Sequence, residues 1–380
     1  MTALERPRLT LREKFWQVRW LFVVLLCSAG GVGIGMLYSA AGGSFSPWAL
    51  RQLARLLVCL ALMVAVAVTD IRFWLRRAYL IYAAAFGLLA AVEIAGSIGM
   101  GAQRWIDLGI INLQPSELMK IALVLALARY FHGCSTEDVR RPGALIPPAL
   151  MVATPAALVL RQPDLGTGMM LMMGGGVMFF AAGVPLWMFA VVLVGGLAAA
   201  PIAWQTLHAY QQQRVLTFLN PEADPLGAGY HIIQSKIALG AGGVFGKGYL
   251  QGTQSHLNFL PEKQTDFIFT MLAEEFGLAG GLALLAIYTL ILAYGLAIAL
   301  SAKNQFGRLL ALGVTTTFFF YLFINIAMVT GLIPVVGVPL PLVSYGGTAM
   351  MALMLGFGLV MCVCVHRSVP VPRRGADDGL

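Results

Sequence analysis

The sequence predicts an all-α, polytopic membrane protein with about ten transmembrane helices, and two observations support this prediction. Hydrophobic residues make up 59% of the 380 residues and charged residues only 11%, whereas a soluble globular domain carries about 25% charged residues. The apolar runs are also continuous and about 20 residues long, the length at which a helix crosses the hydrocarbon core. A transmembrane barrel would instead show alternating segments of about ten residues. Helices are therefore expected to satisfy the backbone in lipid.

Ten apolar runs define the expected spans. The first is too long for the hydrophobic core of a signal peptide, so we interpret it as an uncleaved span. The fifth and sixth are separated by only a few residues and are expected to form a tight hairpin, while the eighth is long enough to tilt or to extend beyond the bilayer. The chain is expected to form a single integral membrane domain, 1–380, with residues 205–265 as a large extracytoplasmic loop. The expected spans are residues 19–40, 49–69, 77–97, 115–131, 144–161, 166–184, 186–204, 266–300, 307–331 and 344–366.

The charged residues set the expected orientation. With the N-terminus inside, most lysine and arginine residues lie in short cytoplasmic segments, and an even number of spans returns the C-terminus to that side. The net charge of +8 does not indicate nucleic-acid binding, because the basic residues lie at helix ends rather than on one soluble face. Gly246-Lys247 lacks the spacing of a phosphate-binding P-loop, so ATP-driven transport is not supported.

Three segments are expected on the outer side, namely residues 98–116, the long loop and the proline-rich connection 331–344. Within the long loop, residues 230–239 are expected to form a short helix along the membrane surface, with Ile233, Ile237 and Leu239 near one face. The glycine-rich stretch that follows should end this helix.

Asp266 is the first candidate for chemistry, because it lies at the outer end of the eighth span, and ionisable groups in or near spans are costly. Two interpretations are open. The carboxylate could cap the following helix, or its apolar neighbours Phe267, Ile268 and Phe269 could raise its pKa and suit it to act as a general base.

Glu117 and Lys120 form the second candidate group. They are three residues apart and share one helical face. They could form an ion pair that neutralises itself in the membrane, or a polar floor for an anionic headgroup. Arg104, shortly upstream, could add positive charge, since a guanidinium suits phosphate.

Asp164 and Glu274 complete the candidates. Asp164 precedes the sixth span, so it could cap that helix or, with Arg161 as its partner, contribute to a polar site. Glu274 lies on roughly the same helical face as Asp266 and could line the same cavity or bond to neighbouring helices. The sequence therefore suggests an outward-opening cavity suited to an amphiphilic anionic substrate whose tail stays in lipid.

Six blocks of sequence, in order along nearly the whole chain, resemble the SEDS family (shape, elongation, division and sporulation). Residues 332–339 are more similar to the elongation branch of that family than to its division branch. One block alone would be weak, but six in order are specific. The blocks are residues 101–105, 114–117, 162–167, 220–230, 265–267 and 339–347.

The resemblance implies a peptidoglycan glycosyltransferase that polymerises lipid II on the outer face of the cytoplasmic membrane, for cell elongation and cell shape. It implies that Asp266 is the essential catalytic residue and that Glu117, Lys120, Asp164 and Arg104 line the substrate site. A class B penicillin-binding protein is the implied transpeptidase partner, together with other membrane proteins of the elongation machinery.

The implied chemistry is an inverting attack of the acceptor 4-hydroxyl on the donor anomeric carbon, with undecaprenyl diphosphate leaving. No organic cofactor is needed. Asp266 could be the base, or it could hold Mg²⁺ or Mn²⁺ with substrate oxygens and water. Two other functions stay open, namely a lipid II flippase and a non-catalytic scaffold for the transpeptidase.

Overall fold

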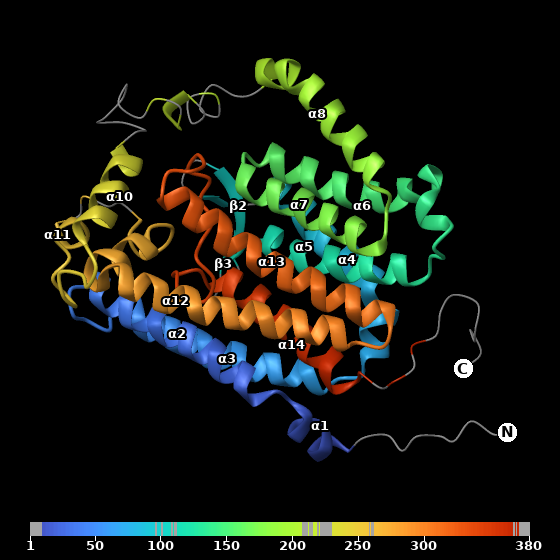
Figure 1. The fold of residues 1–380 in the computed structure, drawn as a ribbon, viewed down its shortest axis with the longest axis horizontal. Helices are drawn as coiled ribbons and strands as arrows, with labels where there is room; N and C mark the ends of the chain where they lie inside the picture. Colours follow the sequence, from blue (N-terminus) through green and yellow to red (C-terminus); the bar gives the residue numbers. More distant parts are fainter. Residues whose placement is uncertain are drawn as a thin grey trace.

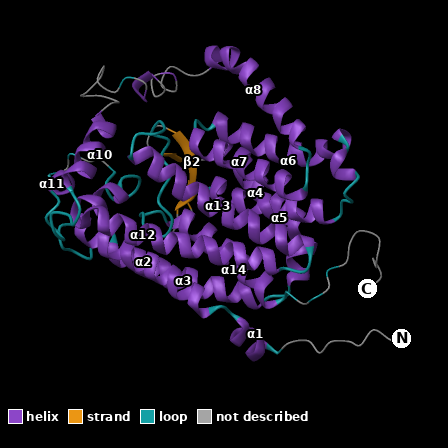
Figure 2. Cartoon of the chain, in the orientation of Figure 1, coloured by secondary structure: helices purple, strands orange, loops and turns teal. Residues whose placement is uncertain are grey.

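The structure, a computed structural model, describes residues 10–95, 97–99, 102–107, 109, 112–206, 212, 216–218, 220, 230–257, 259, 262–367, 369 and 371. It consists of long helices with one small sheet among them (Figure 2), so the predicted all-α class is confirmed. Ten long helices occupy the ten expected spans. Their bounds are α2 Trp20–Ala40, α3 Ala49–Val68, α4 Ile71–Ala95, α5 Pro115–His132, α6 Pro142–Arg161, α7 Leu165–Ala182, α8 Leu186–Thr206, α12 Ile268–Ser301, α13 Gln305–Val329 and α14 Gly347–Val365.

Within the described part of the chain, eight of these helices are long and apolar enough to cross a membrane, and the other two are α5 and α8. In α8 the apolar stretch is shorter, Leu186–Pro201. The short α5 carries Glu117, Lys120 and Arg129, and it is buried along almost its whole length. The charges near its start therefore face protein rather than lipid, and the chain is a multi-pass membrane protein.

The helices run up and down, so alternate connections meet at the same end of the bundle (Figure 1). We call the end at which α5, α7, α12 and α14 begin the loop end. The most enclosed of the candidate spans are α13 and α14, in which 72% and 83% of the apolar window is buried. At the periphery, α8 stands apart from the other helices (Figure 1), and its side chains from Val191 to Val194 are exposed. The packing thus places α5, α13 and α14 at the centre.

The proline-rich connection between α13 and α14 enters the bundle, and we call residues 331–346 the re-entrant segment. A Cβ atom on Gly33, within α2, would lie 2.6 Å from the Cα atom of Val343. A Cβ atom on Gly166, at the start of α7, would lie 2.8 Å from the carbonyl oxygen of Val336. Only glycine leaves room for this backbone at both places, so the segment lies between helices rather than above them.

Residues 98–116, expected as a loop, contain a small antiparallel sheet that was not predicted. Its strands are β1 Ser97–Gly99, β2 Ala102–Asp107 and β3 Asn112–Leu113, in the order β1-β2-β3. Ser97 is opposite Trp105, and Ile106 is opposite Leu113. The three strands are too short to show an alternating pattern in the sequence.

The long eighth span is one continuous apolar run in the sequence, but its backbone forms two helical parts separated by a break. Gly277 interrupts α12 with φ 66° and ψ −163°. The loop after α10 fills the break, since Lys247 N donates to Glu274 O (3.0 Å) and Leu278 N donates to Gly243 O (2.9 Å). Non-helical backbone within a membrane bundle is tolerated where protein satisfies it in this way. The sequence predicted a span long enough to tilt or to extend beyond the bilayer, and the break at Gly277 was not part of that prediction.

The short helix expected in the long loop is present as α10 Tyr230–Ala241. Ile232, Ser235 and Ala238 are buried, whereas Ile237 is 46% exposed. Hydrogen bonds hold the buried face of α10 against the bundle, because the Ser235 hydroxyl donates to Val329 O (2.7 Å) and shares a 2.9 Å hydrogen bond with the Thr270 hydroxyl.

Three other sequence predictions can be compared with the structure. The third span was expected to begin at residue 77, but α4 begins at Ile71, so Arg72, Arg76 and Arg77 lie within its first turns. The interpretation of residues 220–230 as a family block falls mostly on residues 221–229, which lie outside the described residues. The predicted hairpin of the fifth and sixth spans is confirmed by α6 and α7, which pack together.

Candidate functional site

The first turns of α5 carry a buried ion pair. Pro115 occupies the first turn, where its missing N–H costs nothing, and Glu117 follows where the helix dipole favours a carboxylate. The Nζ atom of Lys120 lies 2.8 Å from Glu117 Oε1. Both residues are 4% exposed. The ion-pair interpretation of the sequence is confirmed.

Tyr321 of α13 completes this group. Its hydroxyl donates to the second carboxylate oxygen of Glu117, and the centre of its ring lies 4.2 Å from Lys120 Nζ. The carboxylate thus has two donors, and the ammonium has a carboxylate and a π face. An isolated charge at this depth would be strongly unfavourable, whereas a paired and hydrogen-bonded one is tolerated. We call Glu117, Lys120 and Tyr321 the α5 polar cluster.

Asp164 caps the start of α7. Its Oδ1 atom accepts from Thr167 N (3.1 Å), and its Oδ2 atom accepts from Gln114 Nε2 (3.3 Å). It is 5% exposed, and Arg161, the expected partner, is exposed instead. The helix-cap interpretation is confirmed. Gln114, the residue that precedes α5, also links Asp164 to the start of that helix.

Arg104, in β2, joins the sheet to the turn between α6 and α7. Its Nε atom donates to Gln162 O (3.1 Å), and its Nη2 atom donates to Pro163 O. The Gln162 side chain in turn donates to Leu89 O of α4 (3.0 Å). Part of the guanidinium is therefore committed to fixing the chain at Asp164.

Asp266 is not the cap of α12. The helix begins at Ile268, its N-cap is Phe267, and no side chain caps it. Asp266 is partly exposed, unlike the buried carboxylates of Glu117 and Asp164. Lys263, in the same segment, is also partly buried, and this desolvation lowers the pKa of its ammonium group. The helix-cap interpretation of Asp266 is wrong.

Three consecutive carbonyl groups in front of α12 are each held by a hydrogen bond. Gln264 O accepts from Tyr345 N (2.8 Å), Thr265 O accepts from the Ser344 hydroxyl (2.5 Å), and Asp266 O accepts from Asn325 Nδ2 (2.9 Å). The backbone that carries Asp266 is therefore fixed to α13 and to the re-entrant segment, while the residue itself is partly exposed.

The re-entrant segment also forms the wall beside the carboxylate. A Cβ atom on Gly337 would lie 3.4 Å from Asp266 Oδ2. The neighbouring Val336 and Val338 contact the start of α7 at Gly166. The loop end thus brings together the two places at which the sequence put its candidate carboxylates, with residues 336–338 between them.

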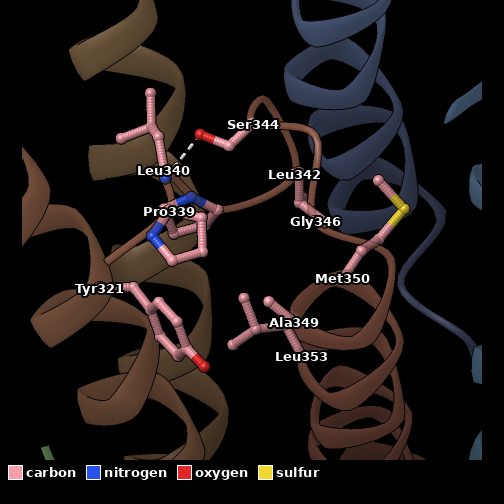
Figure 3. Close-up of a pocket in the computed structure, with 10 residues that line it drawn as sticks. Tyr321, Pro339, Leu340, Leu342, Ser344, Gly346, Ala349, Met350 and Leu353 are labelled. Atoms are coloured by element: carbon pink, nitrogen blue, oxygen red, sulfur yellow. Dashed lines mark hydrogen bonds between the residues drawn. The ribbon is translucent and has the colours of Figure 1, made fainter. Parts of the chain in front are cut away.

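A small cavity lies between α13, α14 and the re-entrant segment (Figure 3). Tyr321 lines it from one side, Ala349 and Leu353 from the other, and the Ser344 hydroxyl bonds to Leu340 N (2.8 Å) at its rim. The space inside it is only about 10 Å³, about the least that holds one water molecule, so a disaccharide headgroup does not fit this cavity.

Sequence reasoning missed four polar residues around these groups, namely Tyr321, Asn325, Ser344 and Arg55. Tyr321 and Asn325 lie four residues apart on α13, so polar groups on one face of an apolar span were the signal available. Ser344 lay inside a recognised block but was read only as part of a motif.

Arg55, in the second turn of α3, was the fourth residue missed. Its guanidinium lies 4.6 Å from the centre of the Tyr345 ring. A Cβ atom on Gly347, at the start of α14, would lie 3.1 Å from its Nε atom. Among the described residues no hydrogen-bond or ion-pair acceptor contacts this guanidinium. It is thus a cation at the loop end that retains donors for a ligand.

Glu274 and Glu275 bond to neighbouring segments instead of lining the site. Glu274 Oε1 lies 3.0 Å from Lys247 Nζ and accepts from Gln254 N (2.8 Å). Glu275 accepts from the Ser39 hydroxyl of α2. Both are buried, and they fix the part of α12 that precedes its break at Gly277.

The described residues contain no group of three or more His, Cys, Asp or Glu side chains that could hold a metal ion. Asp266 is a partly exposed residue, and its carboxylate could supply one ligand to a hard divalent cation whose other ligands are substrate oxygens and water.

The structure defines a class of protein, a polytopic helical membrane protein in which polar side chains and a re-entrant segment meet at one end of the bundle. The chain belongs to the FtsW/RodA/SpoVE family, whose profile, described as "Cell cycle protein", matches residues 19–369. The resemblance to the SEDS family is thereby confirmed.

Named relatives agree with this membership. The chain is 46% identical over 348 residues to peptidoglycan glycosyltransferase MrdB of Escherichia coli K12, covering 91% of this chain and 90% of the relative. It is 32% identical to peptidoglycan glycosyltransferase RodA of Treponema pallidum, covering 90% and 96%.

Solved structures agree as well. RodA of Thermus thermophilus, a rod shape determining protein, superposes with a TM-score of 0.70 at 30% identity, covering 92% of this chain and 98% of that chain. A chain from a peptidoglycan synthase complex, solved to describe the coordination of polymerization and crosslinking, gives a TM-score of 0.82 at 33% identity, covering 93% and 99%.

Proposed function

We propose that this chain polymerises lipid II into glycan strands during cell elongation, with Asp266 as the general base. The chain is a peptidoglycan glycosyltransferase, as its family membership and its relatives MrdB and RodA indicate. The observation that carries the assignment of Asp266 is its position. It is a partly exposed carboxylate on a backbone held at three consecutive carbonyls, and it caps no helix.

The reaction needs a proton acceptor and little else from the protein. The acceptor sugar's 4-hydroxyl oxygen forms a bond to the donor's anomeric carbon, and the bond from that carbon to the diphosphate oxygen breaks. The hydroxyl proton goes to the Asp266 carboxylate, and undecaprenyl diphosphate leaves with the electron pair. Attack opposite the leaving group inverts an α-linked donor to a β-linkage. A general base of this kind contributes typically 10²–10⁴-fold.

The other predicted site residues shape the site through fixed contacts. Lys120 is paired with Glu117, and Arg104 binds two backbone carbonyls. We propose that they and Asp164 form a preorganised polar lining for the headgroup, whose dipoles need no rearrangement during the reaction. We propose that Arg55 steadies the departing diphosphate, because no described residue supplies a hydrogen-bond acceptor to its guanidinium.

A bound Mg²⁺ or Mn²⁺ ion would add positive charge at the diphosphate. Asp266 is the side chain that would hold it, together with substrate oxygens and water. No organic cofactor is required, because the diphosphate is already a good leaving group.

Charge and connectivity support an orientation with both termini in the cytoplasm of a cell with a cytoplasmic (inner) membrane. The short connections and the adjoining helix ends opposite the loop end carry Arg72, Arg140, Arg141 and Lys303, and such segments face the cytoplasm. The loop end, with Asp266, then faces outward, where the headgroup of lipid II is available. We further propose that residues 1–380 act as one membrane domain, with residues 205–265 as its large outer loop.

A class B penicillin-binding protein is the proposed partner. A chain of similar structure was solved in a peptidoglycan synthase complex that coordinates polymerization and crosslinking. Other membrane proteins of the elongation machinery would join the same assembly.

The test uses the purified chain with its transpeptidase partner, labelled lipid II, and gels that separate glycan strands by length, with and without a chelator. Polymer is expected, and loss of polymer with chelator, restored by Mg²⁺, would add the metal. In liposomes, movement of lipid II between the two leaflets without polymer formation would instead favour the flippase. If neither polymer nor movement between leaflets is detected, the scaffold role is favoured.

A further inference from the structure

The re-entrant segment poses a hydrogen-bonding problem that side chains of three helices solve. Its backbone is not helical, yet it lies between helices, where unsatisfied carbonyl groups are unfavourable. Pro341 O accepts from the Tyr288 hydroxyl of α12 (2.6 Å), and Ser344 O accepts from Gln52 Nε2 of α3 (3.0 Å). Val338 O accepts from Asn325 Nδ2 of α13 (2.7 Å).

Asn325 differs from Tyr288 and Gln52 in what else it holds. Its Nδ2 atom donates to Val338 O and also to Asp266 O (2.9 Å). Both acceptors are carbonyl groups, so the NH₂ end of the amide must face them, and the orientation of the side chain is fixed. Asn325 is fully buried, which excludes direct contact with a substrate.

One amide therefore joins the two segments that surround the Asp266 carboxylate. Asp266 itself is on one segment. Gly337 is on the other segment and immediately precedes Val338. It lies so close to Asp266 Oδ2 that there is little room for a side chain. The distance between carboxylate and wall thus depends on Asn325.

We propose that Asn325 is a positioning residue for the glycosyl transfer, acting through the backbone of Asp266 and Val338. The inference rests on the proposed function of Asp266 as the base. A base must lie within hydrogen-bond reach of the hydroxyl that it deprotonates, and a misplacement of about 1 Å can cost on the order of 10²-fold in rate. Loss of Asn325 should therefore lower kcat and leave lipid II binding largely intact.

Ser344 provides a second, independent link between the same two segments, and its substitution is a second test. Its hydroxyl donates to Thr265 O and accepts from Leu340 N, so it also joins the Asp266 segment to the re-entrant segment. The matched control is Thr317→Val. Thr317 is a buried polar residue of α13, and among the described residues its hydroxyl bonds only within its own helix, to Gly313 O (2.9 Å).

The experiment compares Asn325→Ala, Ser344→Ala and Thr317→Val with the wild-type chain in complex with its transpeptidase partner. It measures kcat and KM for lipid II, the thermal unfolding midpoint, and hydrogen–deuterium exchange of residues 262–267. We expect kcat to fall about tenfold or more for the first two variants with KM within about twofold, and exchange of 262–267 to rise. Thr317→Val should match wild type.

Two results would overturn the proposal. One is unchanged kcat in folded Asn325→Ala and Ser344→Ala. The other is unchanged exchange of residues 262–267, which would show that the amide does not hold this segment. If Asn325→Ala does not fold, Ser344→Ala decides on the same criteria. If the wild-type chain makes no polymer, the proposed function fails, and the exchange measurement alone still decides whether Asn325 holds Asp266.

Discussion

Removal of Lys120 should destabilise the fold more than the loss of one surface ion pair would suggest. Lys120 Nζ lies 2.8 Å from Glu117 Oε1, and the two side chains are only 3% and 5% exposed. In Lys120→Met the carboxylate would be left buried without its cation. Breaking a buried pair from one side costs roughly 3–5 kcal/mol, whereas an exposed pair contributes about 0–1 kcal/mol.

The double variant tests this reasoning. In Glu117→Gln with Lys120→Met, neither charge remains, and the Gln side chain can still accept from the Tyr321 hydroxyl. We expect its free energy of unfolding to be closer to wild type than that of Lys120→Met, with a coupling energy of about 2 kcal/mol or more. The assay is equilibrium unfolding in mixed micelles for the four proteins of the cycle. Additive effects of the two substitutions would refute a self-neutralising pair.

Three further predictions concern other parts of the fold. Gly277→Ala should lower stability by more than about 1–3 kcal/mol, because a side chain is strained at φ 66° and its Cβ atom would lie 2.4 Å from a loop amide. Its control is Gly31→Ala, in open space on α2, which should be neutral or slightly stabilising in the same unfolding assay. Asp164→Ala should cost about 0.5–2 kcal/mol through loss of its bond to Thr167 N, and a variant as stable as wild type would argue against the cap. Burial lowers the pKa of His366 below its usual value, so the unfolded chain binds more protons and stability should fall as the pH is lowered through about 6.5; His366→Leu should remove that slope, and an unchanged slope would contradict this cause.

The spans were predictable because lipid imposes a simple length and composition on them. The expected run 49–69 became α3 Ala49–Val68, and 266–300 became α12 Ile268–Ser301. The break at Gly277 was not predictable, because Gly280 and Gly281 follow in the same apolar run with helical geometry. What distinguishes Gly277 is the loop that packs into the break, and that contact is between residues far apart in sequence.

The site was partly predictable for a similar reason. The spacing of Glu117 and Lys120 on one helical face was enough to predict their pairing, because the contact is local. Asp266 could not be separated from a helix cap by sequence, since both interpretations need a carboxylate before an apolar run. The hydrogen bonds from Asn325 and Ser344 to the Asp266 segment could not be predicted, because they join α13 and the re-entrant segment to residues about 60–80 positions away.

The most direct test of the central claim, that Asp266 is the base of the polymerase, is lipid II polymerisation by Asp266→Asn in complex with the transpeptidase partner. The control is Asp107→Asn, the same change at an exposed carboxylate of β2 at the loop end. With both variants folded as judged by thermal unfolding, Asp266→Asn should lose about 10²–10⁴-fold in rate, and Asp107→Asn should match wild type. Polymer formed by Asp266→Asn at the wild-type rate would contradict the assignment.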